Sequence, residues 1–149
     1  MAAEAVTASV HIDAPPERVY EYFTRPEAIV RWMGDYARLE PEPGGQFTVD
    51  VQGAPVRGRF VLLDPPHRLV ISWGYAGSER LPPGASTLDV RFVAEGAGTR
   101  VDLEHRDLPG DERPGHAAGW AHYLARLAVA PVGDPGPDPG MPAPDAARR

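Results

Sequence analysis

The chain opens with an alternation of hydrophobic and polar residues. Residues 4–12, EAVTASVHI, turn Val6, Val10 and Ile12 to one face, which predicts a strand that is buried on one side. The same alternation predicts six more strands, at residues 36–40, 44–51, 54–64, 68–75, 86–95 and 99–108. Turn signals such as Pro65-Pro66 and Gly96-Ala97-Gly98 separate consecutive strands, so we expect antiparallel hairpins.

Helical spacing replaces the alternation in two parts of the chain. Asp13 is the expected N-cap of a first short helix, and Pro26 is expected to end it and to begin a second one. A longer helix is predicted from about Pro114 to Val129, because one face carries an apolar stripe of Trp120, Tyr123, Leu124 and Leu127. This stripe needs a partner, and the inner face of the sheet is the only large apolar surface left to cover it.

The alternation in the last two predicted strands indicates a sheet with one solvent-exposed face. Leu88, Val90 and Phe92 alternate with polar residues, and so do Val101, Leu103 and His105. We expect the intervening residues to face water: Asp89, Arg91, Asp102 and Glu104. The pattern as a whole indicates the α+β class, with the long helix lying across a curved antiparallel sheet.

Composition and charge narrow the classes of function. The net charge is −6 and no basic block occurs, so no nucleic-acid partner is expected. The chain has no cysteine, which excludes disulfides and thiolate chemistry. No apolar stretch approaches the length of a membrane span and no signal-peptide pattern opens the chain, so we expect no membrane insertion and a cytoplasmic location.

Three longer stretches resemble a known family. They are IDAPPERVYEYFTRPEAIVRWM, LLDPPHRLVISW, and GTRVDLEHRDLP followed by GHAAGWAHYLARL. Together they resemble START-like proteins, and among these the family named for the activator of Hsp90 ATPase. The resemblance covers roughly residues 4–130 and implies a helix-grip fold: about seven curved antiparallel strands around a long C-terminal helix, with two short helices after the first strand.

The resemblance also implies a deep hydrophobic cavity between the sheet and the long helix, but no shared reaction. Members include lipid and polyketide binders, cyclases and co-chaperone domains. We expect one START-like domain over residues 1–130. Residues 131–149 are rich in proline and glycine and show no periodicity, so we expect a disordered tail there.

Chemistry-bearing residues do not gather into a catalytic or metal-binding motif. His116 and His122 lie six positions apart, about 240° around a helix, so they cannot share a metal ion. We therefore expect no metal and no cofactor, and we assign no catalytic residue. His105 continues the inward face of its strand, where it either contacts a ligand or is tied to a backbone carbonyl or water. The hydroxyl of Tyr123 also needs a polar partner.

Large and mostly aromatic side chains are expected to line the cavity. The candidates are Trp32, Phe47, Phe60, Trp73, Phe92, His105, Trp120, Tyr123 and Leu124.

Three classes of function remain open. The favoured hypothesis is binding of a hydrophobic or aromatic small molecule in the cavity. The alternative is an enzyme of the cyclase, dehydratase or hydrolase type, which requires two titratable groups to meet inside; the sequence offers His105, Tyr123 and Arg57 or Arg59. The third is a protein-interaction module such as a chaperone cofactor. A non-enzymatic role is favoured, and a homodimer is left open.

Overall fold

A computed structural model describes residues 5–140 of the chain. The strands are β1 (Val6–Ile12), β2 (Tyr36–Leu39), β3 (Gln46–Val51), β4 (Ala54–Asp64), β5 (Arg68–Tyr75), β6 (Ser86–Glu95) and β7 (Gly98–Arg106). The helices are α1 (Pro16–Thr24), α2 (Pro26–Ile29) and α3 (Arg113–Val129), with one 3₁₀ turn, η1 (Gly110–Glu112), before α3. The helix-grip arrangement predicted from the sequence is confirmed.

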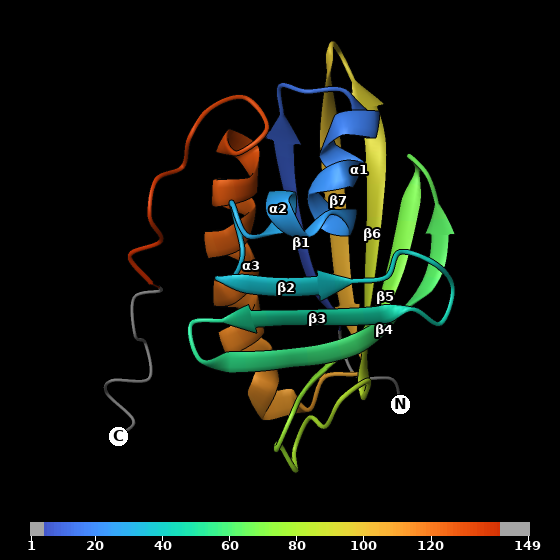
Figure 1. Ribbon diagram of the computed structural model, residues 1–149, viewed down its shortest axis with the longest axis vertical. Helices are drawn as coiled ribbons and strands as arrows, with labels where there is room; N and C mark the ends of the chain where they lie inside the picture. The colour runs from blue at the N-terminus through green and yellow to red at the C-terminus, as the bar shows by residue number, and fades with distance from the viewer. Residues whose placement is uncertain (1–4, 141–149) are drawn as a thin grey trace.

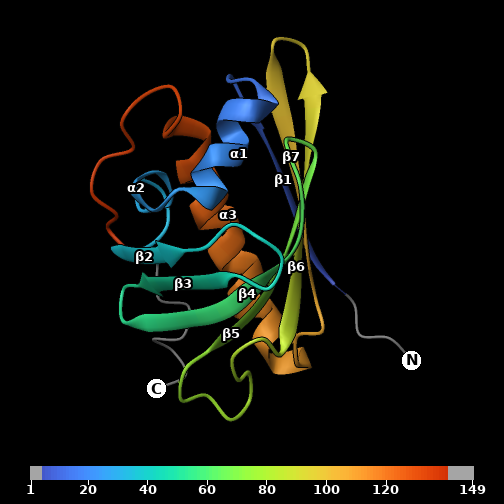
Figure 2. The same ribbon diagram turned by 45° about the vertical axis from the view of Figure 1, so that its right-hand side comes forward.

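The strands form one sheet in the order β1-β7-β6-β5-β4-β3-β2, and all neighbours are antiparallel. The sheet is strongly curved: β2, β3 and β4 run nearly across the direction of β1, β6 and β7, and α3 lies inside the curve (Figures 1 and 2). An irregularity between Phe60 and Leu62 shifts the register of β4 against β5. Such bulges bend a strand and increase its twist, which suits the point where the sheet turns.

The predicted stripe of α3 is the buried face of that helix. Trp120, Tyr123, Leu124 and Leu127 are all buried against the sheet and the short helices. The N-cap prediction for α1 is wrong. The helix begins at Pro16, so Pro15 occupies the N-cap position, and its side chain has no acceptor to cap with. The Asp13 carboxylate lies 2.9 Å from Nε2 of His11 instead.

Asp89 also departs from the sequence-based expectation. It points to the outer face of the sheet as predicted, but only 4% of it is exposed. Two guanidinium groups cover its carboxylate: Arg68 at 2.8 Å from the adjacent β5 and Arg106 at 3.0 Å from β7. The hydrogen bond from Arg68 is the main reason why the pKa of Asp89 is lowered. The alternation gave the correct face, but it could not show that neighbouring arginines exclude water there.

Residues 131–140, here called the C-terminal strap, form no helix or strand but run back along α3 (Figure 1). Two arginines donate 2.8 Å hydrogen bonds to carbonyl oxygens of the strap: Arg31 to that of Gly133, and Arg126 to that of Gly136. The carboxylate of Asp138 lies 2.9 Å from Nε2 of His122. The composition of the segment did not predict these contacts. The remainder of the predicted tail, 141–149, lies outside the described residues.

No helix within residues 5–140 is long and apolar enough to cross a membrane.

Candidate functional site

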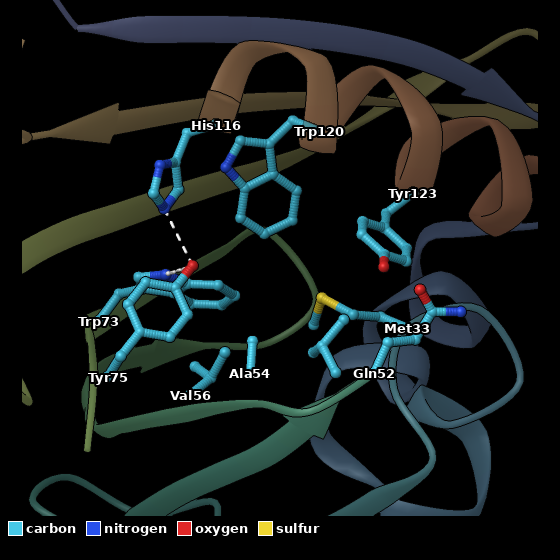
Figure 3. A pocket seen from close by; sticks show the side chains of 10 residues that line it. Met33, Gln52, Ala54, Val56, Trp73, Tyr75, His116, Trp120 and Tyr123 are labelled. Carbon is cyan, nitrogen blue, oxygen red and sulfur yellow. Dashed lines mark hydrogen bonds between the residues drawn. The ribbon is translucent and has the colours of Figure 1, made fainter. Parts of the chain in front are cut away.

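A pocket of about 320 Å³ lies between α3 and the curved part of the sheet (Figure 3). Its lining residues come from α3, β3, β4, β5 and the segment after α2: Met33, Val51, Gln52, Ala54, Val56, Trp73, Tyr75, His116, Trp120 and Tyr123. Most of these side chains are apolar or aromatic, and half of them are buried. Gln52 is exposed, so the pocket reaches the surface beside the β3–β4 turn.

The spacing of residues on α3 and β5 brings the aromatic side chains into the pocket. His116, Trp120 and Tyr123 follow the i, i+4, i+7 pattern and therefore share one face of α3. Trp73 and Tyr75 are two positions apart on β5, so they project from the same face of the strand.

Gly74, between the two aromatic residues of β5, allows a close backbone approach. A Cβ atom at this position would collide with the carbonyl oxygen of Pro82 in the β5–β6 connection. In the same connection, the carbonyl oxygen of Leu81 accepts a 2.9 Å hydrogen bond from the backbone N–H of Tyr75. The absence of a side chain at Gly74 therefore lets the connection pack on β5 and fix the backbone of Tyr75.

Backbone conformation places Gln52 at the mouth of the pocket. Gln52 has φ +47° and Gly53 has φ +87°. Positive φ at both central residues is the requirement of the type I′ turn that favours tight hairpins. The side-chain amide of Gln52 donates a 3.4 Å hydrogen bond to the carbonyl of Asp138 in the C-terminal strap.

A chain of hydrogen bonds crosses the end of the pocket nearest the start of α3 (Figure 3). The indole N–H of Trp73 donates to Oη of Tyr75 at 3.2 Å, and that oxygen lies 3.0 Å from Nε2 of His116. Nδ1 of His116 lies 2.9 Å from the carbonyl oxygen of Glu112.

The carbonyl oxygen of Glu112 can only accept a hydrogen bond, and this fixes which group donates at each step of the chain. Nδ1 of His116 must carry the ring hydrogen, so Nε2 of the neutral ring accepts the O–H of Tyr75. Burial raises the pKa of Tyr75, so its hydroxyl keeps its proton near neutral pH.

Tyr123 lies towards the opposite end of the pocket, on the side of Met33 and Gln52 (Figure 3). No hydrogen bond joins its hydroxyl to any residue in the range 5–140, and burial raises its pKa. The pocket thus has an apolar middle, one end with a closed hydrogen-bond chain and one end with an unused hydroxyl.

His105 lies behind the pocket wall rather than on its surface. It is fully buried, which agrees with the predicted inward face. Trp120 donates its indole N–H to Nδ1 of His105 at 3.1 Å, and Nε2 donates to Oγ of Ser86 at 2.8 Å. Ser86 in turn donates to the carbonyl of Trp73 at 2.7 Å. Burial lowers the pKa of His105 to about 3, with a smaller contribution from His116.

Of the residues predicted to line a cavity, Trp73, Trp120 and Tyr123 line this pocket. The others are buried in the surrounding core: Trp32, Phe47, Phe60, Phe92, His105 and Leu124. Trp32, for example, donates its indole N–H to the carbonyl of Tyr22. A ligand contact by any of these residues stays a prediction.

Sequence reasoning missed Tyr75 and His116 as pocket residues. Both were detectable in principle, since Tyr75 shares strand parity with Trp73 and His116 lies one helical turn before Trp120. The arginines considered for an enzyme do not line the pocket: Arg57 pairs with Asp50 at 2.9 Å, and Arg59 donates to the carbonyl of Gly44.

Metal chemistry receives no support from residues 5–140. Among them, no three His, Asp or Glu side chains lie close enough together to hold a metal ion.

Comparison with known proteins gives a family and a set of structural neighbours. Residues 13–130 match the family described as activator of Hsp90 ATPase homolog 1-like protein. The solution NMR structure of an AHSA1-like protein from Rhizobium etli is 45% identical, with a TM-score of 0.73, and the match covers 95% of this chain and 94% of that one.

Two more distant structures share the fold. A putative protein in the dynemicin biosynthetic locus is 22% identical with a TM-score of 0.73; the match covers 85% of this chain but only 46% of that protein, so this chain spans about half its length. The Aha1 dimer from Colwellia psychrerythraea is 18% identical with a TM-score of 0.75, and the match covers 88% and 98% of the two chains. A comparison with curated protein sequences finds no match.

Proposed function

Because the chain belongs to the activator of Hsp90 ATPase homolog 1-like family, we propose that it binds a hydrophobic or aromatic small molecule in the pocket between α3 and the curved sheet. One observation carries the proposal. The hydroxyl of Tyr123 faces an otherwise largely apolar pocket and forms no hydrogen bond within the described residues. A mostly apolar concave surface with a few unused polar groups is the usual form of a small-molecule site.

The two indole rings supply the flat apolar surface for such a ligand. Trp73 and Trp120 have ring centroids 5.2 Å apart, with the two ring planes tilted by 56°. Val56 and Met33 add aliphatic surface to the pocket lining. A ligand with an aromatic body and one hydrogen-bonding group suits this arrangement, since the group would meet the hydroxyl of Tyr123.

Fluorescence titration tests the proposal directly, because two tryptophans line the pocket. The ligands are naphthalene and 2-acetylnaphthalene, which differ only by a carbonyl-bearing group. Both should quench or shift the emission of the wild-type protein. Tyr123→Phe should weaken binding of the ketone by about 2- to 10-fold, the value of one hydrogen bond, and leave naphthalene unchanged.

Tyr36→Phe is the matched control, because Tyr36 is 53% exposed on β2 and lies outside the pocket. It should bind both ligands like the wild type. If neither ligand changes the wild-type fluorescence, the proposal is wrong.

An enzyme that uses the same pocket is the second candidate. One observation favours it: Tyr75 and His116 are two titratable groups in hydrogen-bond contact on the pocket wall. A cyclase, dehydratase or hydrolase needs such a pair for general acid–base catalysis. Mass spectrometry of a bound ligand after prolonged incubation separates the two candidates, since a binding protein returns it unchanged.

A protein-interaction role has less support. The large exposed hydrophobic side chains among the described residues lie on β2, β4, β6 and around the end of α3, rather than on one element. The likeness to the Aha1 dimer shows the fold alone at 18% identity. A homodimer stays a prediction that light scattering would test, and a cytoplasmic location stays a prediction as well.

A further inference from the structure

In the hydrogen-bond chain at the His116 end of the pocket, every polar hydrogen is already donated to another member of the chain or to the backbone. The N–H of Trp73 is donated to Tyr75, the O–H of Tyr75 to His116, and the Nδ1–H of His116 to the carbonyl of Glu112. With a neutral imidazole, this end can therefore accept a hydrogen bond from a ligand at Oη of Tyr75, but it cannot donate one.

One added proton reverses part of this chain. When Nε2 of His116 takes a proton from solvent, an Nε2–H bond forms and the ring can no longer accept the O–H of Tyr75. Nε2–H then donates to Oη, which continues to accept from Trp73. The O–H of Tyr75 keeps its own proton and is free to turn into the pocket as a donor. No bond is broken in Tyr75, and the only net change is one proton on His116.

We propose that this end of the pocket binds the carboxylate of a hydrophobic or aromatic acid, and that binding takes up one proton at His116. The inference rests on the proposed small-molecule function and specifies the class of ligand. The protonated ring supplies the positive charge, and Tyr75 donates the hydrogen bond that contacts the carboxylate. Tyr123 remains available to a second polar group at the other end.

Protonation of His116 favours an anionic ligand over a neutral one, because each charge needs a counter-charge in this pocket. Among residues 5–140, no arginine lines the pocket, and the sequence contains no lysine. A carboxylate that enters this apolar space would be left without a compensating charge, which is strongly unfavourable. A neutral carbonyl provides no charge to stabilise an imidazolium, so it would not drive the same protonation. The carboxylate and the proton therefore stabilise each other.

The other groups around His116 are compatible with a positive ring. The carboxylate of Glu112 lies 3.9 Å from Nδ1, and Arg80 lies 3.7 Å from the same carboxylate. On the sheet side, the ring of His105 lies 5.2 Å away. Burial keeps His105 neutral, because its pKa is lowered to about 3. Tyr75, which is hydrogen-bonded to the ring, is also neutral, because burial raises its pKa.

Calorimetry with 2-naphthoate, and with 2-acetylnaphthalene as the neutral counterpart, measures the coupling. Titrations at about pH 8, where an ordinary histidine is neutral, are made in phosphate and in Tris, whose ionisation enthalpies differ. The difference between the observed enthalpies, divided by the difference between the two ionisation enthalpies, gives the number of protons taken up. We expect about one proton for 2-naphthoate and none for the ketone, and about a tenfold weaker Kd of 2-naphthoate for each further unit of pH.

Two substitutions separate the roles of the pair. His116→Gln keeps a side chain that can hydrogen-bond but does not titrate, and it should abolish proton uptake and weaken 2-naphthoate at least tenfold, with a clearly smaller effect on the ketone. Tyr75→Phe should weaken 2-naphthoate similarly. His67→Gln, the same change at an exposed turn, is the matched control and should leave both ligands unaffected. Circular dichroism verifies that each variant is folded.

Each remaining outcome is decisive. If 2-naphthoate binds the wild type without proton uptake, or binds His116→Gln equally well, the inference is wrong while the proposed function stands. A neutral donor such as 2-naphthol that binds far more tightly than 2-naphthoate would also overturn it, because Oη of Tyr75 would then act as an acceptor. If neither the ketone nor the acid binds, the proposed function itself fails, and the inference fails with it.

Discussion

The indole N–H of Trp120 donates a 3.1 Å hydrogen bond to Nδ1 of His105, which fixes the tautomer of a fully buried histidine. With Nδ1 as the acceptor, Nε2 must carry the hydrogen that reaches Ser86. Both ring nitrogens are therefore occupied, and His105 connects α3 to β6 and β7 behind the pocket. This bond is the reason why we assign His105 to the scaffold of the site rather than to ligand contact.

His105 should make folding stability sensitive to mild acid. Its pKa is about 3 in the folded protein, below the ordinary histidine value of about 6.5, so the unfolded chain binds more protons between these values. This contribution to stability is complete above about pH 6.5 and is lost as the pH falls towards 3, by at most about 1.4 kcal/mol per pH unit. Urea unfolding of the wild type and of His105→Gln between pH 7 and 4 should show a shallower pH dependence in the variant. Equal slopes would contradict the assignment.

Trp120→Ala should destabilise the fold by about 3 kcal/mol, the lower end of the range for a buried tryptophan. The ring is only 2% exposed and holds His105, but one side of it faces the pocket, where the lost contacts are fewer. Chemical denaturation measures the difference. A change below about 1 kcal/mol would mean that the ring contributes little packing. Ala121→Gly, at an exposed position on the same helix, measures the cost of lost helix propensity alone and should cost about 1 kcal/mol; Trp120→Ala carries no such loss, because alanine is the best helix former.

Removing the C-terminal strap should lower the melting temperature. The deletion of 131–149 removes the acceptors of hydrogen bonds from Arg31 and Arg126 and the carboxylate beside His122. These contacts are partly exposed, so we expect a loss of about 1–2 kcal/mol, or roughly 3–8 °C. A second deletion, of 141–149 only, retains the strap and is the control. Identical melting temperatures for the wild type and the longer deletion would show that the strap adds no stability.

Asp89→Asn should destabilise the protein by about 1–3 kcal/mol, because it replaces two charge-assisted hydrogen bonds on an almost fully buried carboxylate. The pKa of Asp89 is lowered in the folded state, so its contribution is present above the ordinary aspartate value and is lost as the pH falls below about 4. Thermal unfolding at pH 7 and pH 3 should show a smaller gap between the wild type and the variant at the lower pH. Asp102→Asn, on the same outer face but half-buried, should show a weaker effect at pH 7.

The sequence by itself determined the elements and their faces. The alternation predicted seven strands, and the stripe at 120, 123, 124 and 127 predicted the buried side of α3. It also predicted correctly that His105 points inward. These features follow from local periodicity, because a strand or a helix places its side chains by fixed geometry whatever it packs against.

Only the tertiary structure decided which side chains meet. Tyr75 and His116 are 41 residues apart in sequence, and their contact depends on how the curved sheet brings β5 beside the start of α3. The same packing encloses His105 behind Trp120, brings two arginines over Asp89, and gives the strap its contacts with α3. Periodicity determines which side of an element a residue occupies, but hydrogen bonds and ion pairs depend on distances between elements, and these are set by the packing of the whole chain.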